Sequence, residues 1–102
     1  MKVTKVSVIV VGKGSVIVRV DTDEGIVGWG ECSPMNPPLV ARVVVETLGR
    51  QVIGKDPFDL ELITEHLLVK NYKLRGRLYS IAISGLEIAL WDVIGKALGV
   101  PV

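Results

Sequence analysis

The stretch Ser80 to Val102, SIAISGLEIALWDVIGKALGVPV, constrains the fold more than any other part of the chain. Its apolar residues recur every three or four positions, which is the spacing of an amphipathic helix. One face of this helix carries Ala82, Ile83, Leu86, Ala89, Leu90, Val93, Ile94 and Ala97. We expect this face to pack in a core. Because Gly99 can adopt the left-handed conformation that ends a helix, we place the helix at 78–98.

The opposite side of this predicted helix is also partly apolar. Among polar residues it carries Ile81, Ile88, Trp91 and Leu98. A helix with apolar residues on two sides needs two partner surfaces. We therefore predict that these four residues form an interface with another domain or chain. Asp92 and Lys96 have the spacing of a helical ion pair.

Three segments near the amino end show the alternation of β-strands, at 2–11, 15–21 and 26–32. Short glycine-containing turns connect them, which predicts an antiparallel meander. Gly28 and Gly30 fall on one face of the third segment. Glycines inside a strand indicate a bulge or the close approach of another element to the backbone.

Two further helices are predicted between the strands and the long helix. The first covers 37–48, with Asn36 as its capping residue and Gly49 after its end. The second covers 57–70 and is capped by Asp56. Strands come first and helices follow, so the predicted fold class is α+β: a three-stranded antiparallel meander followed by three α-helices.

Length and composition narrow the classes of protein that fit. A chain of 102 residues is one domain. Its net charge of +1 comes from scattered residues, so we expect no nucleic-acid or membrane partner. One cysteine and no leader peptide favour a reducing, cytoplasmic setting. Mean hydropathy is high, at +0.48, which predicts that some apolar surface faces a partner.

Catalytic and metal-binding groups are sparse. Cys32 and His66 are the one conceivable nucleophile and base, but the sequence supplies no third group to orient them. A buried thiol and a surface imidazole are the structural alternative, which we favour. A lone histidine and a lone cysteine also lack the spacing of metal ligands. We therefore predict no catalytic residue and no metal site in this chain.

Three motifs together resemble a known family. They are VRVDTDEGIVGWGECSP from Val18 to Pro34, IGKDP from Ile53 to Pro57, and AISGLEIALWDVIGKALGVPV from Ala82 to Val102. The chain resembles the amino-terminal capping domain of the mandelate racemase and muconate lactonizing enzyme branch of the enolase superfamily. Within this branch, the three motifs are most similar to those of the acid-sugar dehydratases. The resemblance covers nearly all of residues 1–102.

The resemblance implies that two domains have different roles in the enzyme. In this family the amino-terminal domain is a cap over a (β/α)-barrel, and the barrel carries the general base and the carboxylates that hold Mg²⁺. The expected partner is therefore a barrel domain or subunit. No cofactor is expected in this chain, and the chain alone is predicted to be inactive.

The resemblance also implies that two loops of the cap close over the substrate. By residue match, the first is the hairpin that contains Lys13 and Ser15, and it is shorter than is usual in the family. The second contains Cys32, Ser33, Met35 and Asn36. These six residues are the predicted substrate-binding residues.

Three functions are consistent with the amino-acid sequence. The first is the cap of a Mg²⁺-dependent dehydratase, racemase or cycloisomerase. The second is a non-catalytic interaction protein that keeps the cap fold and self-associates, or the small subunit of a split enzyme. The third is a small independent enzyme that uses Cys32. For the first two we expect a homo-oligomer, because an uncovered apolar surface would otherwise face water.

Overall fold

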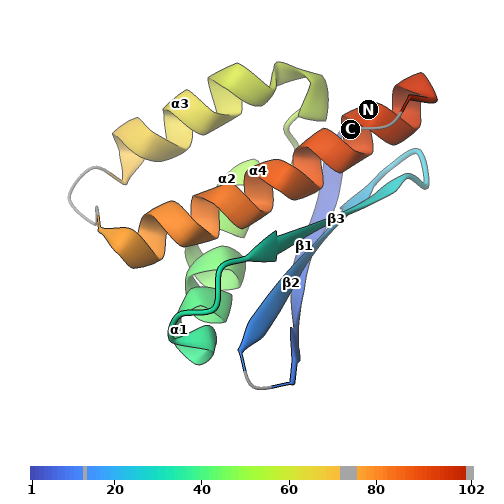
Figure 1. Ribbon diagram of the computed structural model, residues 1–102. Helices are drawn as coiled ribbons and strands as arrows, with labels where there is room; N and C mark the ends of the chain where they lie inside the picture. The colour runs from blue at the N-terminus through green and yellow to red at the C-terminus, as the bar shows by residue number, and fades with distance from the viewer. Residues whose placement is uncertain (13, 72–75, 101–102) are drawn as a thin grey trace.

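The computed structural model describes residues 1–12, 14–71 and 76–100. A three-stranded sheet comes first and helices follow, so the predicted α+β fold is confirmed (Figure 1). The strands are β1 (Val3–Val11), β2 (Ser15–Thr22) and β3 (Val27–Cys32). The helical elements are α1 (Pro37–Arg42), η1 (Val43–Leu48), α2 (Gly49–Val52), η2 (Pro57–Asp59), α3 (Leu60–Lys70) and α4 (Arg77–Leu98).

The sheet is an antiparallel meander in the order β1-β2-β3. In the middle of the sheet Val18 of β2 pairs with Val8 of β1 and with Gly30 of β3. The inner face of β2 is formed by Val16, Val18 and Val20, whose side chains are fully buried. Because successive residues of a strand point to opposite faces, Arg19 lies on the outer face.

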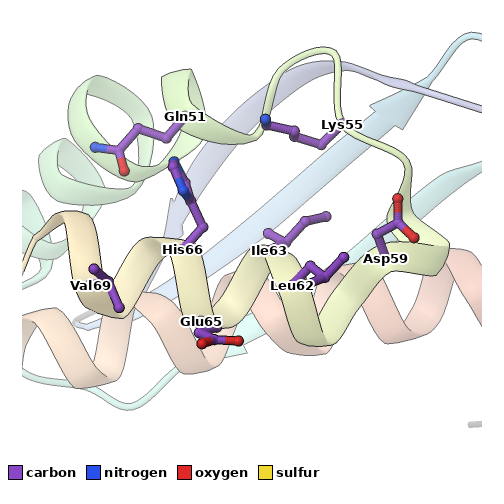
Figure 2. Close-up of a pocket in the computed structure, with 8 residues that line it drawn as sticks. All are labelled: Gln51, Lys55, Asp59, Leu62, Ile63, Glu65, His66 and Val69. Atoms are coloured by element: carbon purple, nitrogen blue, oxygen red, sulfur yellow. The ribbon is translucent and has the colours of Figure 1, made fainter.

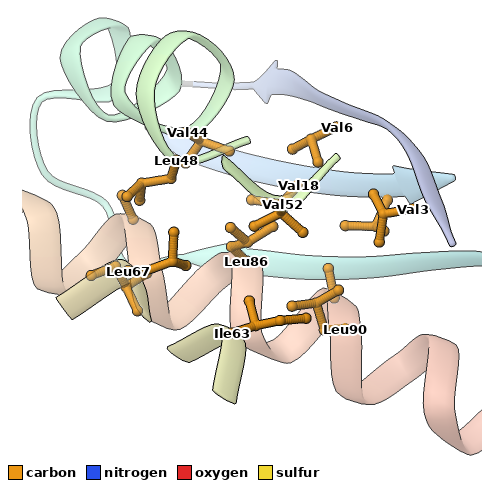
Figure 3. Packing of buried hydrophobic residues seen from close by; sticks show 14 of the residues in the cluster. Val3, Val6, Val18, Val44, Leu48, Val52, Ile63, Leu67, Leu86 and Leu90 are labelled. Atoms are coloured by element: carbon orange, nitrogen blue, oxygen red, sulfur yellow. The ribbon is translucent and has the colours of Figure 1, made fainter. Parts of the chain in front are cut away.

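The long helix α4 covers the inner face of the sheet, and α3 lies alongside α4 (Figure 1). Leu86 and Leu90 of α4 meet Ile63 of α3 in the core that Figure 3 shows. Leu86 is completely buried. Complete burial of such a side chain stabilises a fold by about 1.5–3 kcal/mol. Truncating Leu86 to alanine would cost more, about 2–5 kcal/mol, because a cavity would remain.

The first helix differs from the prediction at its end. It does not stop before Gly49 but continues through the π-helical turns of η1 into α2. Gly49 has helical backbone angles and is buried. A Cβ there would lie 2.7 Å from the carbonyl oxygen of Val44 and 3.0 Å from Cβ of Val6. The glycine therefore permits close packing against β1 and is not a helix stop.

The start of this helix is also formed differently than expected. Asn36 has a left-handed backbone conformation, with φ of 44°, and its side chain caps no helical N–H. Its carbonyl oxygen instead accepts hydrogen bonds from the N–H groups of Leu39 and Val40. The prediction of side-chain capping by Asn36 was wrong, because the backbone satisfies these donors.

Two other predicted helix signals are confirmed. The Asp56 side chain accepts a hydrogen bond of 2.9 Å from the N–H of Phe58, as a capping residue does. Gly99 ends α4 in the left-handed conformation, with φ of 71°. The N–H of Val100 then bonds the carbonyl of Gly95, which satisfies a carbonyl at the helix end.

The buried face of α4 matches the prediction except in its last turn. Seven of the eight core positions expected on α4 are buried, whereas Ala97 is exposed, because the whole last turn from Lys96 is exposed. On α3, Leu62 and Val69 are 66% and 64% exposed, so this helix has an apolar outward side that the pattern did not predict. Within the described residues, no helix is apolar over a length that would span a bilayer.

Candidate functional site

The two predicted substrate loops lie next to each other at one end of the sheet. Val16, at the start of β2, pairs with Cys32, at the end of β3, so the β1–β2 hairpin turn and the loop after β3 emerge at the same end. A Cβ on Gly14 would lie 3.4 Å from Cβ of Pro34. The fold therefore brings together two segments that are separated in the sequence.

A groove of about 440 Å³ lies between the second of these loops and the first turns of α4. We call it the β3–α4 groove. Its lining residues are Ser33, Pro34, Met35, Arg77, Ser80, Ile81 and Ser84. They present three hydroxyl groups and one guanidinium, with no carboxylate among them. Hydroxyls both donate and accept hydrogen bonds, so this lining suits a ligand rich in oxygen.

The predicted substrate-binding residues fall at different places around the groove. Ser33 and Met35 line it. Asn36 is exposed at the end of the same loop, and Ser15 is half-buried at the start of β2. Lys13 lies outside the described residues. Sequence reasoning missed Arg77, Ser80 and Ser84, which come from α4 and carried no motif of their own.

Cys32 is the predicted substrate-binding residue that the structure removes from this surface. Its side chain is buried, and burial raises the pKa of the thiol to about 11. A Cβ added to Gly85 would collide with the sulfur, so the thiol packs tightly against α4. The side chain of Cys32 therefore does not reach the surface of the groove, because β3 directs it into the core.

His66 also does not line the β3–α4 groove. It is exposed on α3 and lines a different groove, of about 500 Å³ (Figure 2). In Figure 2 the imidazole points toward Gln51, whereas Glu65 lies on another side of the helix. The residues that line this groove include no thiol; its other titratable side chains are Lys55, Asp59 and Glu65. The nucleophile and base pair that the sequence allowed therefore does not form.

The apolar stripe predicted on α4 is largely uncovered. Ile88, Trp91 and Leu98 are 46%, 45% and 62% exposed, while Ile81 is half-buried against the core and also lines the β3–α4 groove. We call these four residues the α4 stripe. Because Ile81 belongs to both, the α4 stripe and the β3–α4 groove form one continuous surface.

Polar side chains of α4 secure the free edge of β3. The Asp92 carboxylate accepts a hydrogen bond of 2.8 Å from the N–H of Trp29, and Lys96 donates one of 2.7 Å to the carbonyl of Val27. Asp92 and Lys96 also form the predicted ion pair, at 2.9 Å. Burial acts to raise the pKa of Asp92, but the hydrogen bonds from Lys96 and Trp29 outweigh it and lower the pKa. These contacts fix α4 on the sheet.

Among the described residues, the side chains that could ligate a metal ion lie apart from one another. Within 1–12, 14–71 and 76–100, no three of the histidine, cysteine, aspartate or glutamate residues are placed to hold a metal ion. Several carboxylates are already committed to other partners, such as Asp21, which binds Arg19 through two hydrogen bonds.

The sequence and the fold match a known class of domain. Residues 2–102 match the family described as mandelate racemase / muconate lactonizing enzyme, N-terminal domain. The chain therefore belongs to this family of the enolase superfamily, and it is homologous to the amino-terminal part of acid-sugar dehydratases.

Individual relatives agree with this assignment. The chain is 36% identical to D-galactonate dehydratase from Variovorax paradoxus and 37% identical to that from Pectobacterium atrosepticum, over all of its 102 residues. It spans 27% of the length of each. The relatives are thus much longer proteins.

Solved structures show the same relationship. A mandelate racemase/muconate lactonizing protein from Paracoccus denitrificans, complexed with magnesium, superposes with a TM-score of 0.88 at 32% identity, over 96% of this chain and 28% of that one. A member of the enolase superfamily from Salmonella Typhimurium gives a TM-score of 0.86 at 38% identity, over 95% of this chain and 26% of that one.

Proposed function

We propose that the chain is the substrate-capping domain of a Mg²⁺-dependent enolase-superfamily enzyme, most similar to the acid-sugar dehydratases. The observation that carries the proposal is the position of the two loops. They lie side by side at one end of the sheet, next to a hydroxyl-lined groove that continues into the exposed α4 stripe. This surface offers polar contacts for a substrate beside apolar contacts for a second domain.

In this proposal the loops close over the substrate. Ser33 and Met35 contact it from the groove, Asn36 and Ser15 contribute from the loop ends, and Lys13 is a further proposed contact from the resemblance to the family alone. Closure excludes water and holds the substrate in one orientation, both of which favour the chemical step. Cys32 supports the loop by packing and does not touch the substrate.

The chemistry itself belongs to the barrel in this proposal. Proton abstraction next to a carboxylate needs a positioned base and stabilisation of the developing negative charge. Mg²⁺ bound in the barrel would supply that stabilisation. The described part of this chain contributes binding, orientation and shielding from water, and by itself it is not catalytic.

The α4 stripe is the proposed contact with the barrel domain or subunit. Covering apolar surface stabilises a complex by about 25 cal/mol per Å². Ile88, Trp91 and Leu98 have large side chains with roughly half of their surface uncovered. Without a barrel, the same residues favour self-association, which is the second candidate function. The single thiol suits a reducing, cytoplasmic setting for either protein.

The test compares the chain alone with the chain joined to a barrel. The first step is to establish whether a barrel is encoded in the same reading frame or in a neighbouring one. Both proteins are then assayed against a panel of aldonic and aldaric acids with Mg²⁺. We expect turnover only with the barrel present. Turnover by the chain alone that survives repurification would contradict the proposal, and the lack of any barrel would favour the self-associating protein.

A further inference from the structure

We propose that Arg77 binds a second carboxylate at the far end of the substrate, so that the enzyme prefers acid sugars with a carboxylate at both ends. This inference rests on the proposed function, and it adds a residue that determines specificity. In that function the reacting carboxylate lies at the metal in the barrel. The part of the substrate that reaches the cap is then the opposite end.

Arg77 is positioned to meet that end of the substrate. It is the first residue of α4 and lines the β3–α4 groove together with Ser33 and Met35, which belong to the proposed substrate loop. The helix that carries Arg77 is held on the sheet by close backbone packing of Gly85 against Gly30. Arg77 therefore begins a helix that is packed on the sheet, and it lies beside the loop, an arrangement that suits recognition of a substrate group.

The charge of Arg77 has no counterion among the described residues. Arg19 pairs with Asp21 and Arg42 lies 4.0 Å from Glu46, but no such ion pair involves Arg77 in the described ranges. The first turn of α4 contains no acidic residue, and the groove lining contains no carboxylate. A guanidinium binds a carboxylate through two parallel hydrogen bonds, and such charged pairs are stronger than neutral ones.

The rest of the groove suits the carbon chain of an acid sugar. Ser33, Ser80 and Ser84 can each donate to or accept from a sugar hydroxyl. Apolar side chains, including Met35 and Ile81, form the walls, and a less polar surrounding strengthens the attraction between opposite charges. The volume of about 440 Å³ lies in the range of small-molecule sites. A substrate that ends in a neutral hydroxymethyl group would form no charged pair with Arg77, whose side chain is otherwise exposed.

The experiment uses the protein that combines this cap with its barrel. Galactarate and galactonate are compared as substrates, because they differ only in the terminal group. Wild-type protein should show a kcat/KM for galactarate that is about 10-fold or more above that for galactonate, since hydrogen bonds to a charged group contribute about 1.5–3 kcal/mol. Arg77→Gln should lower kcat/KM for galactarate about 10-fold to 100-fold and leave galactonate within about 2-fold.

Two control variants separate a role in recognition from a role in folding. Arg77→Lys keeps the charge and should restore part of the preference for galactarate, whereas Arg42→Gln, on the exposed side of α1, should leave both substrates unchanged. Turnover of acid sugars without a preference for galactarate, or an equal loss on both substrates in Arg77→Gln, would overturn this inference and leave the proposed function intact. Failure of the wild-type protein to turn over any acid sugar would overturn both.

Discussion

Gly30 in β3 packs directly against the backbone of Gly85 in α4, and a Cβ on Gly30 would collide with the carbonyl oxygen of Gly85. The same Cβ would lie 2.7 Å from the backbone nitrogen of Ala89. Backbone atoms within a helix cannot move aside individually. The contact brings α4 onto the sheet, and it thereby sets the position of both the α4 stripe and the β3–α4 groove.

Replacing Gly30 with alanine should therefore destabilise the fold. Overpacking of a tight contact costs about 1–3 kcal/mol or more, and we expect a loss near 3 kcal/mol, or more than about 10 °C in Tm for a domain of this size. Chemical denaturation followed by circular dichroism measures it. Glu31→Ala, at the next and exposed position of β3, is the matched control and should change stability by less than about 0.5 kcal/mol. Equal stability of the two variants would show that α4 does not approach β3 so closely.

The contact between Asp92 and the edge of β3 predicts a pH-dependent stability. The pKa of Asp92 is lower in the folded protein than its ordinary value of 3.8. A carboxylate of this kind contributes stability that is fully present above its ordinary pKa and is lost as the pH falls through the lower, folded-state pKa. Asp92→Asn removes the charge but keeps an oxygen that can accept the hydrogen bond from Trp29.

We expect Asp92→Asn to cost about 1 kcal/mol at pH 7, since one charged contact of a partly exposed group is lost. The difference from wild type should shrink as the pH falls below 3.8 and should approach zero once Asp92 is protonated in the folded protein. Denaturation curves at several pH values provide the measurement, with Glu61→Gln on the exposed side of α3 as the control. A difference that stays constant from pH 7 to pH 2 would show that the charge of Asp92 plays no part.

Most of the fold follows from the periodicity of the sequence, and the exceptions have local causes. Alternating valines identified the strands, and the spacing from Ala82 to Ile94 identified the buried face of α4. Gly49 was misread as a stop because sequence alone does not distinguish a glycine that ends a helix from one that another element approaches closely. The π-helical turns of η1 depend on tertiary packing and have no sequence signal of their own.

The site was only partly predictable, because it is assembled from distant segments. The resemblance to the family indicated the loop that contains Ser33 and Met35. Arg77 and Ser84 join that loop only because α4 crosses the end of β3, and no spacing in the sequence shows this. The burial of Cys32, which the sequence favoured over a nucleophilic thiol, is confirmed, and Cys32 shares the inner face of β3 with Gly28 and Gly30.

The buried position of Cys32 predicts an unreactive thiol. The thiolate is the reactive form, and a pKa of about 11 leaves very little of it at pH 8. We expect labelling by an aromatic disulfide reagent at pH 8 to be at least about 100-fold slower in the native protein than in the protein unfolded in guanidinium chloride. The Cys32→Ser variant has no thiol and therefore gives the background signal of the reagent. Rapid stoichiometric labelling of the native chain would contradict this prediction and would support a role for Cys32 as a nucleophile.

The exposed α4 stripe predicts that the isolated chain self-associates. At micromolar concentration we expect a mass by light scattering above the 11.0 kDa of one chain, because closed oligomers cover equivalent apolar patches. Ile88→Asp should shift the protein toward the monomer. Leu62→Asp on the outward side of α3 is the control, since Leu62 is also exposed and apolar. If Leu62→Asp dissociates the oligomer and Ile88→Asp does not, then α3 and not the α4 stripe forms the contact.

The central claim, that this chain supplies the cap and a barrel supplies the chemistry, is tested most directly by adding the two parts to each other. The 102-residue chain and its barrel are produced separately and assayed for dehydration of an acid sugar with Mg²⁺, alone and in mixtures of increasing chain concentration. We predict that neither part alone approaches the rate of the mixture and that the rate rises to saturation as the chain is added. If the barrel alone already has the full rate and addition of the chain does not change that rate, the account is contradicted. Turnover by the chain alone would also contradict it.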